Sequence, residues 1–218
     1  MSERLAALVT LLVWILAVWG ISLVDPYVAR PYLDEGGPVE GLSAILAGAA
    51  ASAALIALAR HARRHGGKPT PTAVREAVVM GLLGVLLAGE ELSWGEGLVW
   101  EATTTDRTRR LDAFHDVLNL LAAKGAAEPI AIVIVVVGVS IVALGSRAAA
   151  APWRRAAFAL GLLSIAAAVD TLHLEGIPLL ATEELGELLC DVWLLAAALA
   201  VGRPATHAGP PSASSLKG

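Results

Sequence analysis

Six stretches of this chain are mostly apolar and roughly 20 residues or longer, which is the length that a helix needs to cross a bilayer. They cover residues 5–24, 39–60, 74–100, 128–146, 154–175 and 179–202. Hydrophobic residues make up 56% of the chain and the mean hydropathy is +0.69, which is too apolar for an ordinary soluble domain. A helix bonds its own backbone groups in lipid, so we expect an all-α fold. The sequence predicts a polytopic transmembrane helix bundle of about six spans, with residues 1–202 as one domain within the lipid bilayer.

Two segments fall outside this pattern. Residues 107–124 have helical periodicity but are too polar to cross, because one face is apolar and the other carries Asp, Asn and His115. We expect an interfacial or re-entrant helix there that caps the bundle. Residues 203–218 are rich in Pro, Ser, Ala and Gly, which predicts a disordered tail.

The second stretch carries small residues at helical spacing. Ala44, Gly48 and Ser52 share one face of that helix. Such a stripe lets two helix backbones approach closely. We expect it to pack tightly against another helix of the same bundle.

The loops alternate in charge along the chain. The loop after the second stretch contains Arg60, Arg63, Arg64 and Lys68, whereas the loop after the first is acidic. The loop after the fourth is again basic, and the group Arg107, Arg109 and Arg110 is the exception. Since cytoplasmic loops are enriched in Lys and Arg, both termini are expected in the cytoplasm and the protein in the cell (inner) membrane. Topology thus explains the basic loops, and neither a phosphate-binding loop nor a nucleic-acid surface is indicated.

Ionisable residues interrupt three of the apolar stretches, where lipid disfavours them. Each costs about 2.5–3.5 kcal/mol at the centre of a membrane helix on insertion scales, so such a group usually faces a cavity or a partner. They are Glu90, Glu91, Asp170, His173, Glu183, Glu184, Glu187 and Asp191. The spacing i, i+3, i+7 puts Glu184, Glu187 and Asp191 on one helix face. We expect one outward-facing acidic pocket, with His115 of the capping helix above it.

So many carboxylates cannot all stay ionised at low dielectric unless protons or a cation neutralise them. Carboxylate oxygens with one or two imidazoles suit Zn, Mn, Fe or Ca, and the lone Cys190 excludes a cysteine-based metal cluster. The candidate ligands of this divalent metal ion are Glu91, His115, Asp170, His173 and Glu187. Glu90 or Glu184 would then act as the catalytic general base. A proton-sharing site and a purely structural polar network are the alternatives.

Residues 89–96, Gly-Glu-Glu-Leu-Ser-Trp-Gly-Glu, resemble the Gly-Glu-Glu-Ile-Ser-Trp-Gly-Gln signature of a group of uncharacterised bacterial multi-pass membrane proteins. Residues 113–116 are similar to a His-Asn pair of that group, and residues 183–187 to its late Glu-Glu-x-x-Glu stretch. The chain departs from the group at Glu96 and Asp116, where Gln and Asn are usual. A more distant analogy is with alkaline ceramidase-like membrane hydrolases, which are similar in placing His, Asp and Ser around a metal within a helix bundle.

Three functions fit these features. The first is metal-dependent hydrolysis of a lipid-like substrate in the acidic pocket. The second is a proton or cation transporter, although the apolar run from Ala77 to Ala88 offers no polar path to the cytoplasm. The third is a structural or accessory subunit whose charges only orient its helices. The sequence leaves the oligomeric state open.

Overall fold

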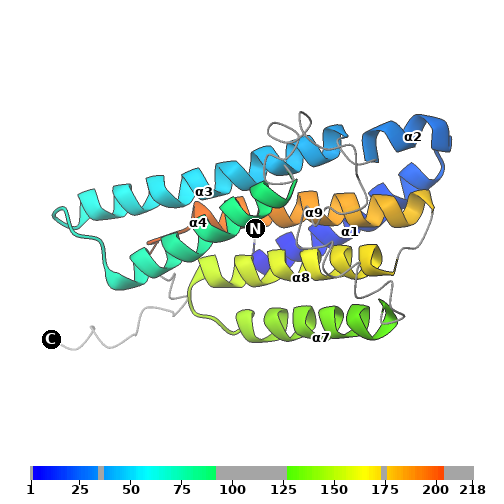
Figure 1. Ribbon diagram of the computed structural model, residues 1–218. Helices are drawn as coiled ribbons and strands as arrows, with labels where there is room; N and C mark the ends of the chain where they lie inside the picture. Colours follow the sequence, from blue (N-terminus) through cyan, green and yellow to red (C-terminus); the bar gives the residue numbers. More distant parts are fainter. Residues whose placement is uncertain (1, 34–36, 92–126, 173–175, 204–218) are drawn as a thin grey trace, which may run out of the picture.

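A computed structural model of the chain describes residues 2–33, 37–91, 127–172 and 176–203, with the backbone alone of Glu90 and Glu91. The regular elements in these ranges are all helices, without a strand (Figure 1). They are α1 (Glu3–Ser22), α2 (Pro26–Leu33), α3 (Pro38–Arg64), α4 (Pro71–Glu91), α7 (Ala127–Gly145), α8 (Ala151–Thr171) and α9 (Ile177–Ala198). The predicted all-α class is therefore confirmed. The capping helix predicted over residues 107–124 lies outside the described residues, and so does the tail predicted over residues 203–218, apart from Arg203.

The structure describes a helix in each of the six predicted apolar stretches, and in the third, residues 74–100, the described part ends at Glu91. Four segments are long and apolar enough to cross a membrane: Glu3–Ser22, Pro26–Arg64, Pro71–Gly89 and Ala127–Gly145. The protein therefore has the helices of an integral membrane protein. Helices α8 and α9 have 21 and 22 residues but are less apolar, because arginines open α8 and four acidic residues lie in α9. Helix α2 was not expected, since Pro26 and Pro31 favour a loop in a segment of that length.

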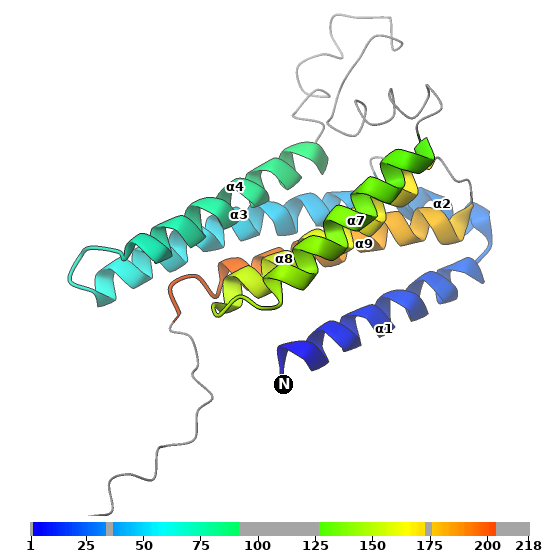
Figure 2. The same ribbon diagram turned by 90° about the horizontal axis from the view of Figure 1, so that it is seen from below.

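The helix with the most acidic residues in the described part lies at the centre of the bundle. Helix α9 packs against α1, α2, α3, α4 and α8 (Figures 1 and 2). Its one exposed large apolar side chain is Val192, whereas α1 and α7 expose most of theirs. This arrangement follows from the sequence, because α1 and α7 can face lipid along most of their surface while acidic α9 needs protein around it. The carboxylates of α9 are thereby brought into the interior.

Small residues let the helices approach closely. A Cβ atom added to Gly84 of α4 would lie 2.7 Å from the Ala47 carbonyl oxygen and 2.7 Å from the Ala51 nitrogen, both in α3. Helices α7 and α8 meet in the same way at Gly138, which faces Ser164. The sequence-based prediction that the face of α3 with Gly48 and Ser52 makes the close helix contact was wrong. Gly48 has open space around it and Ser52 is exposed.

Helix α1 is attached to the bundle by three side-chain contacts along its length. The Glu3 carboxylate pairs with Arg154 Nε at 2.6 Å and Arg155 Nε at 3.1 Å, both on α8. The Trp193 indole N–H of α9 donates to Thr10 Oγ1 at 3.1 Å. Trp14, the buried residue of α1, lies over Gly186 of α9.

Replacing Thr10 with valine is expected to lower the free energy of unfolding by about 1–2 kcal/mol, because the buried Trp193 N–H loses its acceptor without a change in side-chain shape. Thermal unfolding of the detergent-purified protein measures this loss. Thr182→Val is the matched control, since the Thr182 hydroxyl donates to Pro178 of its own helix. Equal unfolding midpoints for the two variants would contradict the assigned contact.

Successive long helices run in opposite directions, which gives the bundle two chemically different ends (Figure 1). At the acidic end, α4 and α8 finish and α3, α7 and α9 begin. Its acidic residues in the described part are Asp25, Glu40, Glu128, Asp170, Glu183, Glu184 and Glu187, together with Glu90 and Glu91, of which the backbone alone is described. The opposite, basic end holds Arg60, Arg63, Arg64, Lys68, Arg75, Arg147, Arg154, Arg155 and Arg203. Arg30 at the acidic end, and Glu3 and Glu76 at the basic end, are the exceptions.

Candidate functional site

The predicted site residues that the structure describes all come from the acidic end. Asp170 lies in the last turn of α8, and Glu184 and Glu187 lie in the first half of α9, which packs against α8. Glu90 and Glu91 are the last two residues of α4, and their side chains lie outside the described part. His115 and His173 lie outside it as well. The predicted metal ligands and general bases therefore remain a prediction as a set.

The described carboxylates of this region are half-buried and already engaged. Asp170, Glu183, Glu184 and Glu187 are neither fully exposed nor fully buried, and none of them is without a partner. Within the described ranges, no three His, Cys, Asp or Glu side chains lie close enough to hold a metal ion. A metal centre at this end of the bundle would thus need ligands from residues 90–126 or 173–175 in addition to those of α8 and α9.

Asp191 lies one helical turn deeper than Glu187, about 6 Å further along α9. Its side chain is buried, with 1% of its surface exposed. Oδ2 is hydrogen-bonded to the hydroxyl of Ser43, which is equally buried on α3. Oδ1 is buried as well and has no hydrogen-bond partner among the described residues. The carboxylates of α9 therefore lead from half-buried groups near the acidic end to one fully buried group.

Beyond Asp191, the side of α9 that meets α3 and α4 is apolar. Toward the basic end, α9 buries Leu194, Ala197 and Ala198 against Met80 of α4 and alanines of α3. In the described part of the chain, this cluster separates Asp191 from the polar groups of the basic end. The described carboxylates of α9 thus lie on the acidic-end side of this cluster.

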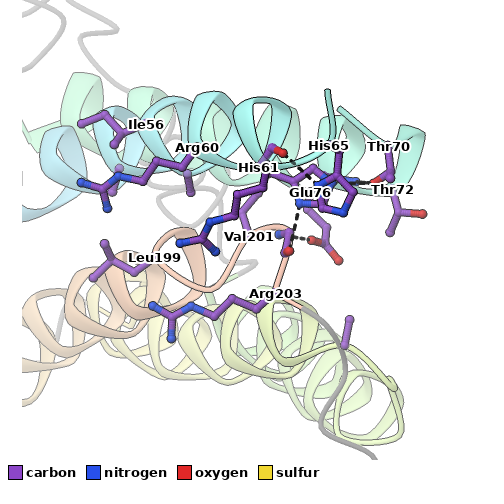
Figure 3. Close-up of a pocket in the computed structure, with 16 residues that line it drawn as sticks. Ile56, Arg60, His61, His65, Thr70, Thr72, Glu76, Leu199, Val201 and Arg203 are labelled. Atoms are coloured by element: carbon purple, nitrogen blue, oxygen red, sulfur yellow. Dashed lines mark hydrogen bonds between the residues drawn. The ribbon is translucent and has the colours of Figure 1, made fainter. Parts of the chain in front are cut away.

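A second polar cluster, which was not predicted from the sequence, lies at the basic end (Figure 3). The His61 ring links two segments, because its Nδ1 lies 3.0 Å from the Gly202 carbonyl oxygen and its Nε2 lies 3.2 Å from the Thr70 hydroxyl. The Gly202 N–H donates to Oε2 of the buried Glu76 at 3.1 Å. These residues line a cavity of ≈ 730 Å³ between α3, α4 and the end of α9.

Sequence reasoning missed Ser43, Glu76 and His61 for the same reason. Ser43 looks like any helix serine, which commonly bonds to its own backbone. Glu76 and His61 lie among basic residues near helix ends, where solvated charges are common. The one available signal was Glu76, an acidic residue that opens a long apolar run beside a basic loop.

No protein-family model, no curated protein and no solved structure matches this chain. The resemblance of residues 89–96 to a group of bacterial membrane proteins therefore stays a prediction. The function has to be inferred from the chain's own residues.

Proposed function

We propose that this chain is a six-span membrane protein that binds a divalent cation in the acidic half of its bundle. The observation that carries the proposal is Asp191, a buried carboxylate with one oxygen on Ser43 and the other without a partner among the described residues. Burying such a charge is costly unless a counter-charge neutralises it. Asp191 also lies on the α9 face that carries Glu184 and Glu187, which lead toward the acidic end.

A divalent cation fits this region better than a monovalent one. Asp170 and the acidic residues of α9 bring several negative charges to the packed ends of α8 and α9. Oxygen-rich sites of this kind favour hard or borderline divalent cations, including Ca, Mn, Fe and Zn. Asp170, Glu187, Glu91, His115 and His173 are the proposed ligands, and the charge of the cation would compensate the buried carboxylate of Asp191 one turn deeper on α9.

The proposed orientation places both termini and the basic end in the cytoplasm. Alternating helix directions and the separation of acidic from basic residues support it. Helices α8 and α9 would then also span the bilayer. The charges of α9 would be surrounded by other helices of the bundle rather than by lipid, namely α1, α3, α4 and α8. A bound metal would supply Lewis-acid activation of water, and Glu90 and Glu184 are the proposed bases for hydrolysis of a lipid-like substrate.

The apolar cluster beyond Asp191 disfavours the transporter alternative. A proton or cation relay needs polar groups or water along the whole path. Leu194, Ala197 and Ala198 offer neither in the described part of the bundle. A site that opens to one side of the membrane is the arrangement that this cluster supports.

Elemental analysis of the detergent-purified protein tests the proposal. We expect near-stoichiometric divalent metal in the wild type and a loss of at least about tenfold in affinity for Glu187→Gln, because the amide keeps the shape but removes the charge. Glu128→Gln is the matched control, since Glu128 is an exposed carboxylate of α7 at the same end.

Two results would overturn the proposal. One is a well-folded wild-type protein that neither contains metal nor gains thermal stability from added Ca²⁺, Mn²⁺ or Zn²⁺. The other is equal metal loss in Glu187→Gln and Glu128→Gln. Either result would favour the structural role, in which these charges orient helices and bind no ligand.

A further inference from the structure

We propose that the cavity at the basic end binds the phosphate group of an anionic ligand, either a phospholipid headgroup or a free phosphate compound. The cavity of ≈ 730 Å³ is lined by three arginines, Arg60, Arg64 and Arg203. It lies at the opposite end of the bundle from the proposed cation site, with the apolar cluster between them. The two proposals can therefore fail independently.

The three arginines come from two separate parts of the chain. Arg60 and Arg64 lie one turn apart on α3, so they share a helix face, and Arg203 follows α9. Figure 3 shows Arg60 and Arg203 extending toward the same side of the cavity. In the described residues, none of the three guanidinium groups has an acidic partner, whereas Arg154 and Arg155 share Glu3. Arg60 and Arg64 carry like charges at i, i+4 on one helix and repel one another, so a bound anion would relieve this repulsion.

The one carboxylate among the residues that line the cavity, that of Glu76, already accepts a hydrogen bond. Glu76 is buried, with 3% of its surface exposed, and accepts the Gly202 N–H. It therefore holds the chain after α9 rather than neutralising an arginine. Three cationic side chains against one engaged carboxylate leave the cavity with an excess of positive charge.

The chain that carries Arg203 is fixed in place by Gly202. Its φ of +67° is a conformation that favours glycine, and an added Cβ would lie 2.6 Å from His61 Nδ1. A carbonyl oxygen can only accept, so His61 Nδ1 carries the hydrogen in its contact with Gly202. His61 and Glu76 thus hold the turn that brings Arg203 to the same cavity as Arg60 and Arg64.

The cavity has an apolar wall beside its cationic one. Ile56 of α3 and Leu199, just after α9, also line it, and both are largely exposed. Close by, the guanidinium of Arg75 lies 5.6 Å from the ring centre of Trp153, an aromatic residue of the kind that marks a membrane interface. Arginines bind phosphate oxygens in paired hydrogen bonds, and basic pockets between membrane helices hold anionic headgroups. A phosphate group on the arginines, with apolar atoms against Ile56 and Leu199, fits both walls.

Thermal unfolding of the detergent-purified full chain tests this inference. The probes are inorganic phosphate, dihexanoyl phosphatidate and dihexanoyl phosphatidylcholine, with sodium chloride to match the ionic strength. We expect a saturable rise in the unfolding midpoint of about 2–4 °C with phosphatidate, alone or together with inorganic phosphate, and none with phosphatidylcholine. The double variant Arg60→Gln/Arg203→Gln should need at least about ten times more ligand for the same rise.

Arg63→Gln is the matched control, because Arg63 is an exposed arginine of α3 that does not line the cavity. Arg64→Gln provides a second variant of the cavity itself. A response to phosphatidate alone would identify a lipid headgroup as the ligand, and an equal response to inorganic phosphate would identify a free phosphate compound. No saturable response to either probe, or an equal loss in Arg63→Gln, would overturn the proposal.

Discussion

Gly84→Ala is expected to lower the free energy of unfolding by about 1–3 kcal/mol. The added methyl group would lie 2.7 Å from two backbone atoms of α3, the Ala47 oxygen and the Ala51 nitrogen. Backbone atoms inside a helix cannot move aside as the end of a flexible side chain can. The two helices would have to separate along a contact that spans much of their length, so the loss of packing extends beyond the substituted residue.

Gly81→Ala is the control for this prediction. Gly81 lies on the same helix, one turn earlier, and an added Cβ there would have nothing within 4 Å. Alanine favours a helix over glycine by about 0.5–1 kcal/mol, so this variant should be as stable as the wild type or slightly more stable. Thermal unfolding of both variants in the same detergent gives the comparison. Equal midpoints would show that α3 and α4 are not in close contact at Gly84.

These glycines also show how far the sequence determines the packing. The helices of the bundle were predictable, because long apolar stretches are visible in the sequence by length alone. Their contact faces were not, because α3 carries Ala or Gly on every side and many small-residue stripes can be drawn on it. The contact uses Ala47 and Ala51 rather than Gly48 and Ser52, and that choice depends on where α4 and α9 press against α3. Periodicity along one helix cannot supply that information.

The same reasoning applies to the candidate site. Helical spacing correctly put Glu184, Glu187 and Asp191 on one face, since that relation is local to α9. The partner of Asp191 is Ser43, which is 148 positions away along the chain. A hydrogen bond between distant helices has no local signature, and the His61–Gly202 contact, 141 positions apart, was missed for that reason. Charges can be found from sequence, but their partners depend on the packing.

Asp191→Asn is expected to abolish stabilisation by divalent cations while the cation-free protein becomes more stable by about 1–2 kcal/mol. The asparagine side chain has the same shape, and its carbonyl oxygen can accept from the Ser43 hydroxyl. It brings no charge into the interior, so the cost of burying a carboxylate with one oxygen unpartnered among the described residues disappears. Thermal unfolding with and without added Ca²⁺, Mn²⁺ or Zn²⁺ measures both effects.

Ser43→Ala separates this interpretation from a structural one. Removing the hydroxyl leaves Asp191 Oδ2 without its donor, so stability should fall by about 1–3 kcal/mol. If the Ser43–Asp191 pair served only to join α3 to α9, both substitutions would weaken the same contact and neither would change the response to cations. In the cation-free protein, Asp191→Asn should raise the free energy of unfolding and Ser43→Ala should lower it. These opposite changes, together with a lost cation response in Asp191→Asn, are expected only if the Asp191 carboxylate is kept at a cost to stability. A group retained at such a cost is typical of a binding site, because the ligand supplies the missing counter-charge.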